Sequence, residues 1–173
     1  MKYPRQAALH LMVAACFAVL PVQAASQSAN DPLSVVSEQD FLNAISLLRP
    51  PLDVKKTDDG FDLTLPNGLE ANAQLQNCED RATSSNCRTL SIIVNLLKPE
   101  GKSREELLEL VNQLNRRDIH GRSFLNNGDQ IITRWTFFAT GHESSRGLAT
   151  KLVNWDAFVR GAAALLYGQQ RRD

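Results

Sequence analysis

The chain has 173 residues, of which 22% are charged, and its 19 Lys and Arg side chains balance 19 Asp and Glu. Nucleic-acid binding depends largely on cations that neutralise phosphates, so the lack of a basic excess argues against a nucleic-acid partner. The length suits one domain with its own hydrophobic core, and we find no internal repeat or low-complexity tract that indicates a second domain.

The first 24 residues have the pattern of a secretory signal peptide. Lys2 and Arg5 precede an apolar run over 7–20, and Pro21 and the small residue Ala24 follow it. This order predicts export and cleavage after Ala24. The run is shorter than the roughly 20 residues that a membrane-spanning helix needs. We therefore expect a periplasmic or secreted protein that keeps no stable membrane span after cleavage.

Cys16 offers an alternative to simple cleavage. Residues 13–16 read Val-Ala-Ala-Cys, which is similar to the lipobox of a lipoprotein, whose cysteine becomes lipidated. The apolar run continues past Cys16 to Leu20, whereas a lipobox normally ends such a run. Cleavage after Ala24 is therefore favoured, and a lipoprotein anchored through Cys16 stays as the alternative.

The domain is expected to begin with a short amphipathic helix. Residues 25–36 are mostly small and polar at their start, which is typical of a linker. Ser37 is a good N-cap, acidic residues follow it, and a pair of prolines at 50–51 ends the helix. The apolar residues recur on one helical face: Phe41, Ile45 and Leu48.

A run of strand-like segments follows the prolines. Turn signals at 58–60 (Asp-Asp-Gly) and 67–68 (Asn-Gly) separate the first segments. Within the segments apolar and polar residues alternate, which predicts an antiparallel meander with one buried face and one wetter face. The segments lie at 52–56, 61–65, 69–76 and 89–96.

Cys78 and Cys87 are the two cysteines that remain once the signal peptide is removed. In an oxidising compartment such neighbours are expected to pair, and their spacing fits a bridge across the base of a loop between strands. A redox-active pair more often has the spacing C-x-x-C. A zinc site that adds His120 and His142 has suitable ligand types but no paired spacing that pre-organises it. We expect a structural disulfide and keep both alternatives open.

The second half of the chain predicts a helix, a hairpin and a final helix. Ser103 and Glu106 form a capping box at the start of the first of these helices. A turn at 126–129 joins two strand-like segments, and residues 169–173 form a polar tail. The final helix carries an apolar stripe made of Leu148, Leu152, Trp155, Val159, Ala162 and Leu166.

The predicted order of elements is α-β-β-β(-β)-α-β-β-α. Runs of strands interrupted by single helices are typical of an α+β fold, here an antiparallel sheet of about five to six strands with the helices on one side. The order places one domain at 37–168, between the linker 25–36 and the tail 169–173.

Residues 37–168 resemble the YbjN-domain family of bacteria, labelled sensory transduction regulators. The resemblance rests on Asn112 and Asn115 in LVNQLNRR, the segment HGRSFL, the turn NNGDQII, an aromatic-rich strand, and NWDAF in the last helix. Exported members look similar in having one cysteine at a strand end and another just before the next strand. Leu114 stands where many members carry an aromatic residue.

This resemblance implies a fold similar to that of type III secretion chaperones. Such a domain is small, often forms a homodimer, binds other polypeptides and is not an enzyme. The resemblance implies no cofactor and carries over no catalytic residue. We accordingly expect an exported binding module, chaperone-like or regulatory, that acts on a polypeptide or envelope partner.

Basic side chains gather at the end of the second predicted helix. Arg116, Arg117 and Arg122, together with His120, could bind an anion or an acidic partner peptide. Cations at a helix C-terminus also offset the helix dipole, and the sequence favours that structural role over binding.

Three further residues are candidates for partner binding. Asn112 and Asn115 lie three positions apart on one helix, where they could recognise a ligand or, as we favour, bond to backbone at the sheet edge. Trp155 could anchor a dimer, because the last helix is long and one-sided. Large aromatics are nevertheless more often core residues.

An envelope hydrolase is the rival function. It would use His142 or His120 with a nearby serine, Ser144 or Ser145. The sequence has no G-x-S-x-G nucleophile elbow, and neighbouring residues of one loop rarely hold triad geometry. A polar loop that caps the last helix is therefore favoured. The hydrolase requires a concave pocket that brings a histidine within hydrogen-bond distance of a serine.

Overall fold

The computed structural model describes residues 28–50, 52–81, 83–117 and 120–168. The predicted signal peptide 1–24, Cys16 and the predicted tail 169–173 lie outside the described residues, as does the side chain of Arg117. The predictions made for those positions are not tested by the structure.

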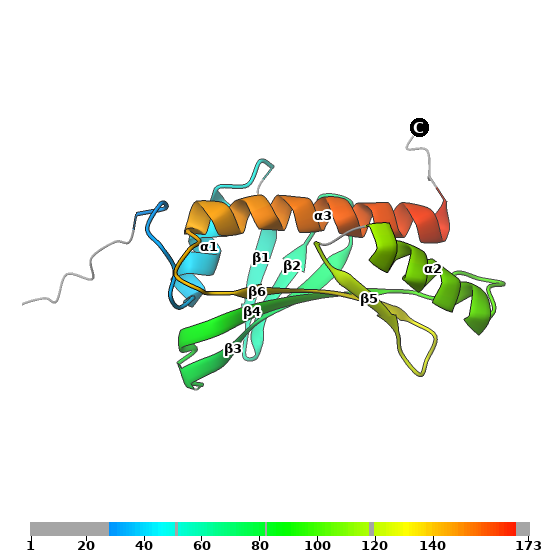
Figure 1. Ribbon diagram of the computed structural model, residues 1–173, viewed down its shortest axis with the longest axis horizontal. Helices are drawn as coiled ribbons and strands as arrows, with labels where there is room; N and C mark the ends of the chain where they lie inside the picture. The colour runs from blue at the N-terminus through cyan, green and yellow to red at the C-terminus, as the bar shows by residue number, and fades with distance from the viewer. Residues whose placement is uncertain (1–27, 51, 82, 118–119, 169–173) are drawn as a thin grey trace, which may run out of the picture.

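The described chain forms one six-stranded antiparallel sheet in the order β1-β2-β3-β4-β6-β5, with helices on one side (Figure 1). The predicted α+β fold and the predicted order of elements are both confirmed. The elements are α1 (Glu38–Ser46), β1 (Asp53–Thr57), β2 (Gly60–Thr64), β3 (Glu70–Asp80), β4 (Ser85–Leu96), α2 (Arg104–Arg117), β5 (Arg122–Leu125), β6 (Ile131–Phe138) and α3 (Ser145–Tyr167).

The hydrophobic core lies between the sheet and the helices. In β4 the residues Leu90, Ile92 and Val94 face the helices and are fully buried, as the alternating pattern predicts. In the described part of the chain no helix covers the opposite face of the sheet, and Phe138 of β6 is 61% exposed there. The outer face of β6 is therefore exposed to solvent at this residue.

Each helix begins at a capping residue. Ser37 and Asp40 form a capping box at α1, and Ser103 and Glu106 exchange backbone and side-chain hydrogen bonds at the start of α2, the capping box that the sequence predicts. Ser144 accepts a hydrogen bond from a backbone N–H in the first turn of α3. In the described part of the chain, none of the helices combines the length and apolar character needed to cross a bilayer.

The long hairpin of β3 and β4 holds the disulfide. The strand register places Cys78 directly opposite Cys87, and the two sulfurs are bonded, which is the pairing that the sequence predicts. Cys87 also forms a two-way backbone bridge with Val36, whose N–H donates to the Cys87 carbonyl at 2.7 Å. The disulfide thus joins the two strands of the hairpin, and the backbone bridge to Val36 connects the hairpin to the chain that precedes α1.

The chain ahead of α1 packs on the domain. Leu33 and Val36 lie in the stretch for which the sequence predicts a linker, yet they are only 2% and 0% exposed. Leu33 also exchanges backbone hydrogen bonds with Gly141 and Glu143, in the loop between β6 and α3. The described part of this stretch, from residue 28, thus adds to the core.

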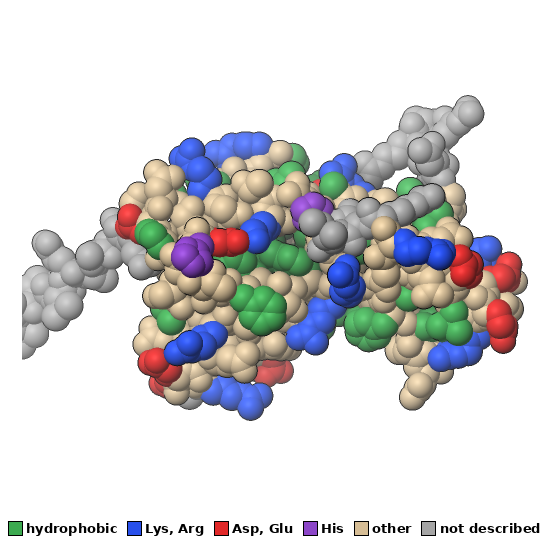
Figure 2. Space-filling view, viewed as in Figure 1, with side chains coloured by type: hydrophobic (Ala, Val, Ile, Leu, Met, Phe, Trp, Pro, Cys, Tyr) green, Lys and Arg blue, Asp and Glu red, His purple; other side chains and the backbone are tan. Residues whose placement is uncertain are grey.

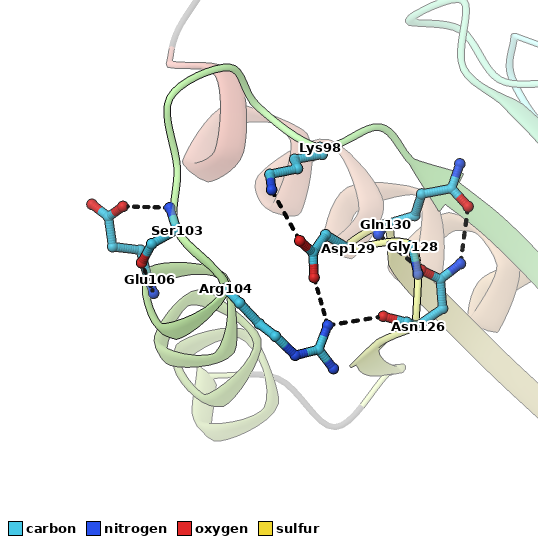
Figure 3. Close-up of polar contacts among 8 residues, drawn as sticks. All are labelled: Lys98, Ser103, Arg104, Glu106, Asn126, Gly128, Asp129 and Gln130. Carbon is cyan, nitrogen blue, oxygen red and sulfur yellow. Dashed lines mark hydrogen bonds and ion pairs between the residues drawn. The ribbon is translucent and has the colours of Figure 1, made fainter.

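A polar network fixes the turn between β5 and β6 (Figure 3). Asp129 receives ion pairs from Lys98, at 2.9 Å, and from Arg104 at the start of α2. Hydrogen bonds from Lys98 and then Arg104 hold the pKa of the Asp129 carboxyl below its ordinary value of 3.8. The Asn126 side chain closes the turn by accepting from the N–H groups of Gly128 and Gln130, each at 2.9 Å. The hairpin is therefore held against α2 and the end of β4.

Candidate functional site

The two strands of the last hairpin differ in length. β5 pairs with the first half of β6, from Leu125 opposite Ile131 to Arg122 opposite Arg134. The second half of β6, residues 135–138, has β4 on one side, and no strand of the described chain pairs with its other side. This half-strand is an open edge of the sheet.

Two residues direct their backbone groups toward this open edge. The N–H of Ala139 donates to the Arg88 carbonyl of β4 at 2.9 Å. Because backbone groups of alternate residues point to opposite sides of a strand, those of Trp135 and Phe137 also face β4. The N–H and C=O groups of Thr136 and Phe138 then face outward, and within the described chain no hydrogen bond reaches them.

The two terminal strands of the sheet, β5 and β1, are protected. On the outer side of β5, the Asn115 amide donates to the Ser123 carbonyl and accepts from the Ser123 N–H, both at 2.8 Å. Asn115 thus occupies the positions that a neighbouring strand would take. At the far edge, β1 carries Lys55 and Lys56, and charged edge strands are a common protection against strand pairing. Residues 135–138 of β6 have neither kind of protection in the described part of the chain.

A groove of about 990 Å³ runs between this edge and α3. Trp135 and Thr136 contribute the strand side, and the α3 side carries small and polar residues. Figure 2 looks onto this face, where the two described histidines lie apart with a basic and an acidic side chain between them. The remaining lining residues are His120, Gly121, Arg122, Phe124, Arg134, His142, Glu143, Ser144, Gly147, Thr150, Lys151 and Asn154.

Among the described residues that line the groove, cations outnumber acids. The acidic residue among them, Glu143, is paired with Lys151 at 2.6 Å. Arg134 donates to two neutral acceptors, the Ser91 hydroxyl at 2.9 Å and the Gln76 side chain at 3.4 Å. Arg122 lies directly opposite Arg134 in the register, on the same face of the sheet. The groove is therefore suited to a ligand that carries negative charge.

Gly121 allows the chain to enter β5 beneath α3. A Cβ atom at this position would lie 2.5 Å from a ring carbon of Phe158, which is closer than side chains approach. Phe158 is buried on α3. The glycine in the HGRSFL segment is thus required by packing at one end of the groove.

The predicted basic group is only partly assembled at this site. His120 and Arg122 line the groove, whereas Arg116 lies on the exposed surface of α2 and pairs with Glu109 at 2.8 Å. Asn115 bonds to backbone at the sheet edge, as the sequence favours, and its amide is fully used there. Asn112 is exposed on α2.

Trp155 does not lie at the surface. It is 0% exposed, in the apolar stripe by which α3 packs on the sheet. The expectation that Trp155 anchors a dimer is therefore wrong, because the apolar stripe faces the core and leaves no part of the indole exposed to a partner. Its large apolar area contributes to the stability of the fold instead.

His142, Ser144 and Ser145, which the alternative hydrolase would use, lie close together in sequence, but the structure does not join them into a catalytic pair. Ser144 caps α3, Ser145 is buried at the start of that helix, and His142 is exposed. No hydrogen bond between the described residues joins His142 to either serine. The described residues also contain no group of three or more His, Cys, Asp or Glu side chains placed to hold a metal ion.

Sequence reasoning missed the groove and its strand edge. Thr136 and Phe138 matter here through their backbone, which no side-chain motif reveals. A signal was present nonetheless: a four-residue strand is followed, after a tight turn, by an eight-residue strand. Such a mismatch leaves half of the longer strand without a hairpin partner.

The fold and the groove define a small α+β domain with an open strand edge. A family model described as "Putative bacterial sensory transduction regulator", YbjN, matches residues 54–155. The chain therefore belongs to the YbjN family, as its resemblance to that family led us to expect.

Among solved structures, the chain is similar to the type III secretion chaperone SycH of Yersinia pestis, crystallised with a stable fragment of YscM2. The two are 14% identical, the match covers 73% of this chain and 94% of that chain, and the TM-score is 0.43. This likeness is too distant to assign a function. A comparison with curated proteins finds no match.

Proposed function

We propose that the protein is a non-enzymatic module that binds a segment of another polypeptide. The groove beside the open edge of β6 carries this proposal, because it combines unpaired backbone groups with a lining of mixed apolar and basic side chains. Exposed strand edges are a recurrent means by which proteins bind peptides. Membership in a family described as regulators is in keeping with binding rather than chemistry.

A polypeptide suits the groove better than a small molecule does. The outward backbone groups recur along the strand, at Thr136 and again at Phe138, and a polypeptide backbone repeats its own donors and acceptors in the same way. A small ligand would meet only part of this row. The α3 side adds Thr150 and Asn154, whose polar groups can bond to either backbone or side chains.

Photo-crosslinking in the cell tests the binding proposal. A photoreactive amino acid replaces Asn154, which faces the groove, and in a control variant replaces Ala157, which is exposed elsewhere on α3. We expect adducts with another polypeptide from position 154 and none from position 157. Equal adducts at both positions, or no adduct at position 154, would contradict polypeptide binding in the groove.

We also propose that the protein acts in the cell envelope. The pattern of residues 1–24 and the disulfide between Cys78 and Cys87 support this location, because disulfides persist in oxidising compartments. The intact mass of protein from the periplasmic fraction tests it. We expect a chain that begins after Ala24 and has lost two thiol hydrogens. A mass that includes a lipid on Cys16 would establish the lipoprotein alternative instead.

The homodimer remains a prediction. With Trp155 buried, a dimer needs another surface, and light scattering on the exported protein at several concentrations measures its mass.

A further inference from the structure

We propose that the bound segment adds to the sheet as a strand along residues 135–138 of β6, in line with β5, and that it carries an acidic side chain beside Arg134. This inference rests on the proposed polypeptide binding and names its geometry and the chemistry of the partner.

The hydrogen-bonding pattern defines where such a strand lies. β5 uses the outward backbone groups of β6 as far as Arg134, and the same row continues with Thr136 and Phe138. A segment in extended conformation, of about four residues at roughly 3.4 Å each, spans this row and satisfies the four outward groups. The pairing of β5 with β6 stops at Arg122, and the added strand would extend the pairing along the rest of β6.

The charge of the groove defines the partner's chemistry. Arg134 stands at the end of the pairing with β5, beside the open half of β6, on the face of the sheet away from the helices. The nearest hydrogen-bond acceptors of Arg134 are neutral. A carboxylate on the added strand, on the same face, would be attracted to the Arg134 guanidinium group.

A second copy of this chain fits the edge less well. In an antiparallel pairing of two β6 edges, each copy would bring its own Arg134 to the shared sheet. The two basic surfaces would repel each other, whereas an acidic segment complements them.

Amide hydrogen exchange tests the geometry without altering the protein. In the free protein, the amides of Thr136 and Phe138 should exchange faster than those of Trp135 and Phe137, which face β4. A short capped peptide of alternating valine and glutamate should slow exchange at Thr136 and Phe138 at least about tenfold when it saturates the groove. Its counterpart with lysine in place of glutamate should bind at least about tenfold more weakly.

A proline substitution in the protein tests whether the outward N–H of Thr136 bonds to the added strand. Thr136→Pro removes one outward N–H and no bond to β4, since proline is tolerated on a strand edge whose N–H faces solvent. Thr136→Val keeps the N–H and is the matched control. We expect the proline variant to bind the valine–glutamate peptide at least about tenfold more weakly than the valine variant. If the proline variant unfolds, the exchange measurement on the unaltered protein decides.

Each other outcome would overturn the inference. Slower exchange that appears with rising protein concentration and no peptide would mean that a second copy occupies the edge. Equal binding of the glutamate and lysine peptides, or no binding of the glutamate peptide, would show that the partner is not selected for an acidic side chain. If position 154 crosslinks to a polypeptide while exchange at Thr136 and Phe138 stays unchanged, polypeptide binding stands and strand addition fails. If position 154 gives no adduct, the proposed function itself fails.

Discussion

Gly121 shows how a single missing side chain shapes one end of the groove. The chain passes beneath the Phe158 ring at this point, and a Cβ atom would lie 2.5 Å from one ring carbon and 2.7 Å from another. Gly121→Ala must therefore displace a buried ring. Overpacking of this kind costs about 1–3 kcal/mol, which we expect as a loss in the free energy of unfolding measured by urea denaturation.

Gly161 offers a matched control for that substitution. It lies within α3, and a Cβ atom there would have no neighbour within 4 Å. Because glycine is a poor helix former, Gly161→Ala should raise the free energy of unfolding by up to about 1 kcal/mol. If both alanine variants shift stability in the same direction, the loss at Gly121 does not come from contact with Phe158.

At the scale of elements, β5 depends on the helix beside it. Its outer backbone groups at Ser123, a buried residue, are satisfied by the Asn115 amide and not by another strand. Asn115→Ala leaves a buried donor and a buried acceptor unpaired, at about 1–3 kcal/mol for each. Because two groups are left unpaired, we expect the free energy of unfolding to fall by about 2–6 kcal/mol in chemical denaturation.

Asn112 is the control on the same helix. Its side chain is exposed, and Asn112→Ala should change the free energy of unfolding by less than about 0.5 kcal/mol. The pair separates the two roles that the sequence allows for these asparagines. If Asn115→Ala weakens partner binding while stability is unchanged, Asn115 recognises a ligand and the backbone role assigned to it is wrong.

The hairpin of β5 and β6 is held by charges that depend on pH. Ion pairs with Lys98 and Arg104 lower the pKa of Asp129 below 3.8, so folding favours its ionised form. The resulting stabilisation is fully present above pH 3.8, the ordinary value, and is lost as the pH falls through the lowered pKa.

Asp129→Asn tests this dependence. Asparagine tolerates the left-handed backbone of this residue, where φ is 57°, so the turn geometry is kept. The variant should be less stable at neutral pH, and its difference from the unaltered protein should shrink as the pH falls below 3.8. A difference that stays constant across urea melts at pH 7 and at pH 3 would show that the charge of Asp129 contributes nothing.

At the scale of the whole molecule, local patterns predict most of the fold. Alternation along β4, the capping box of α2 and the stripe on α3 each depend on residues near in sequence, so they can be recognised without the structure. The pairing of Cys78 with Cys87 was predicted from the expected oxidising compartment and from the presence of two cysteines after the predicted signal peptide. The role of Asn115 was also predicted from the sequence, since an edge strand beside a helix has backbone groups that a side-chain amide can satisfy.

The parts that were missed depend on contacts between distant segments. Leu33 and Val36 lie in a stretch that begins with small polar residues, and only the partners Glu143 and Cys87 reveal that they are core residues. The groove arises because β5 begins opposite Arg134, whereas β6 continues beyond that residue. The unequal lengths of the two strands hint at an unpaired half of β6, but the register that determines which half is unpaired is set by the assembled sheet.

The segment before α1 leads to a prediction about the domain boundary. A chain that starts at residue 37, where the sequence places the domain, lacks both Leu33 and Val36. Burial of a Leu or Val side chain is worth roughly 1.5–3 kcal/mol. We therefore expect a chain that starts at residue 37 to be less stable than one that starts at residue 28 by about 3–6 kcal/mol in urea denaturation.

Single substitutions separate the core contribution from the effect of shortening the chain. Leu33→Ala should cost about 2–5 kcal/mol, while Ser34→Ala at the exposed neighbouring position should change stability by less than about 0.5 kcal/mol. Leu33 also holds the loop that carries His142 and Glu143, because it exchanges backbone hydrogen bonds with Gly141 and Glu143. The shortened chain should therefore lose crosslinking at position 154 at temperatures where it is still folded. Equal denaturation midpoints for the two chain lengths would mean that residues 28–36 are dispensable and that the groove is formed without them.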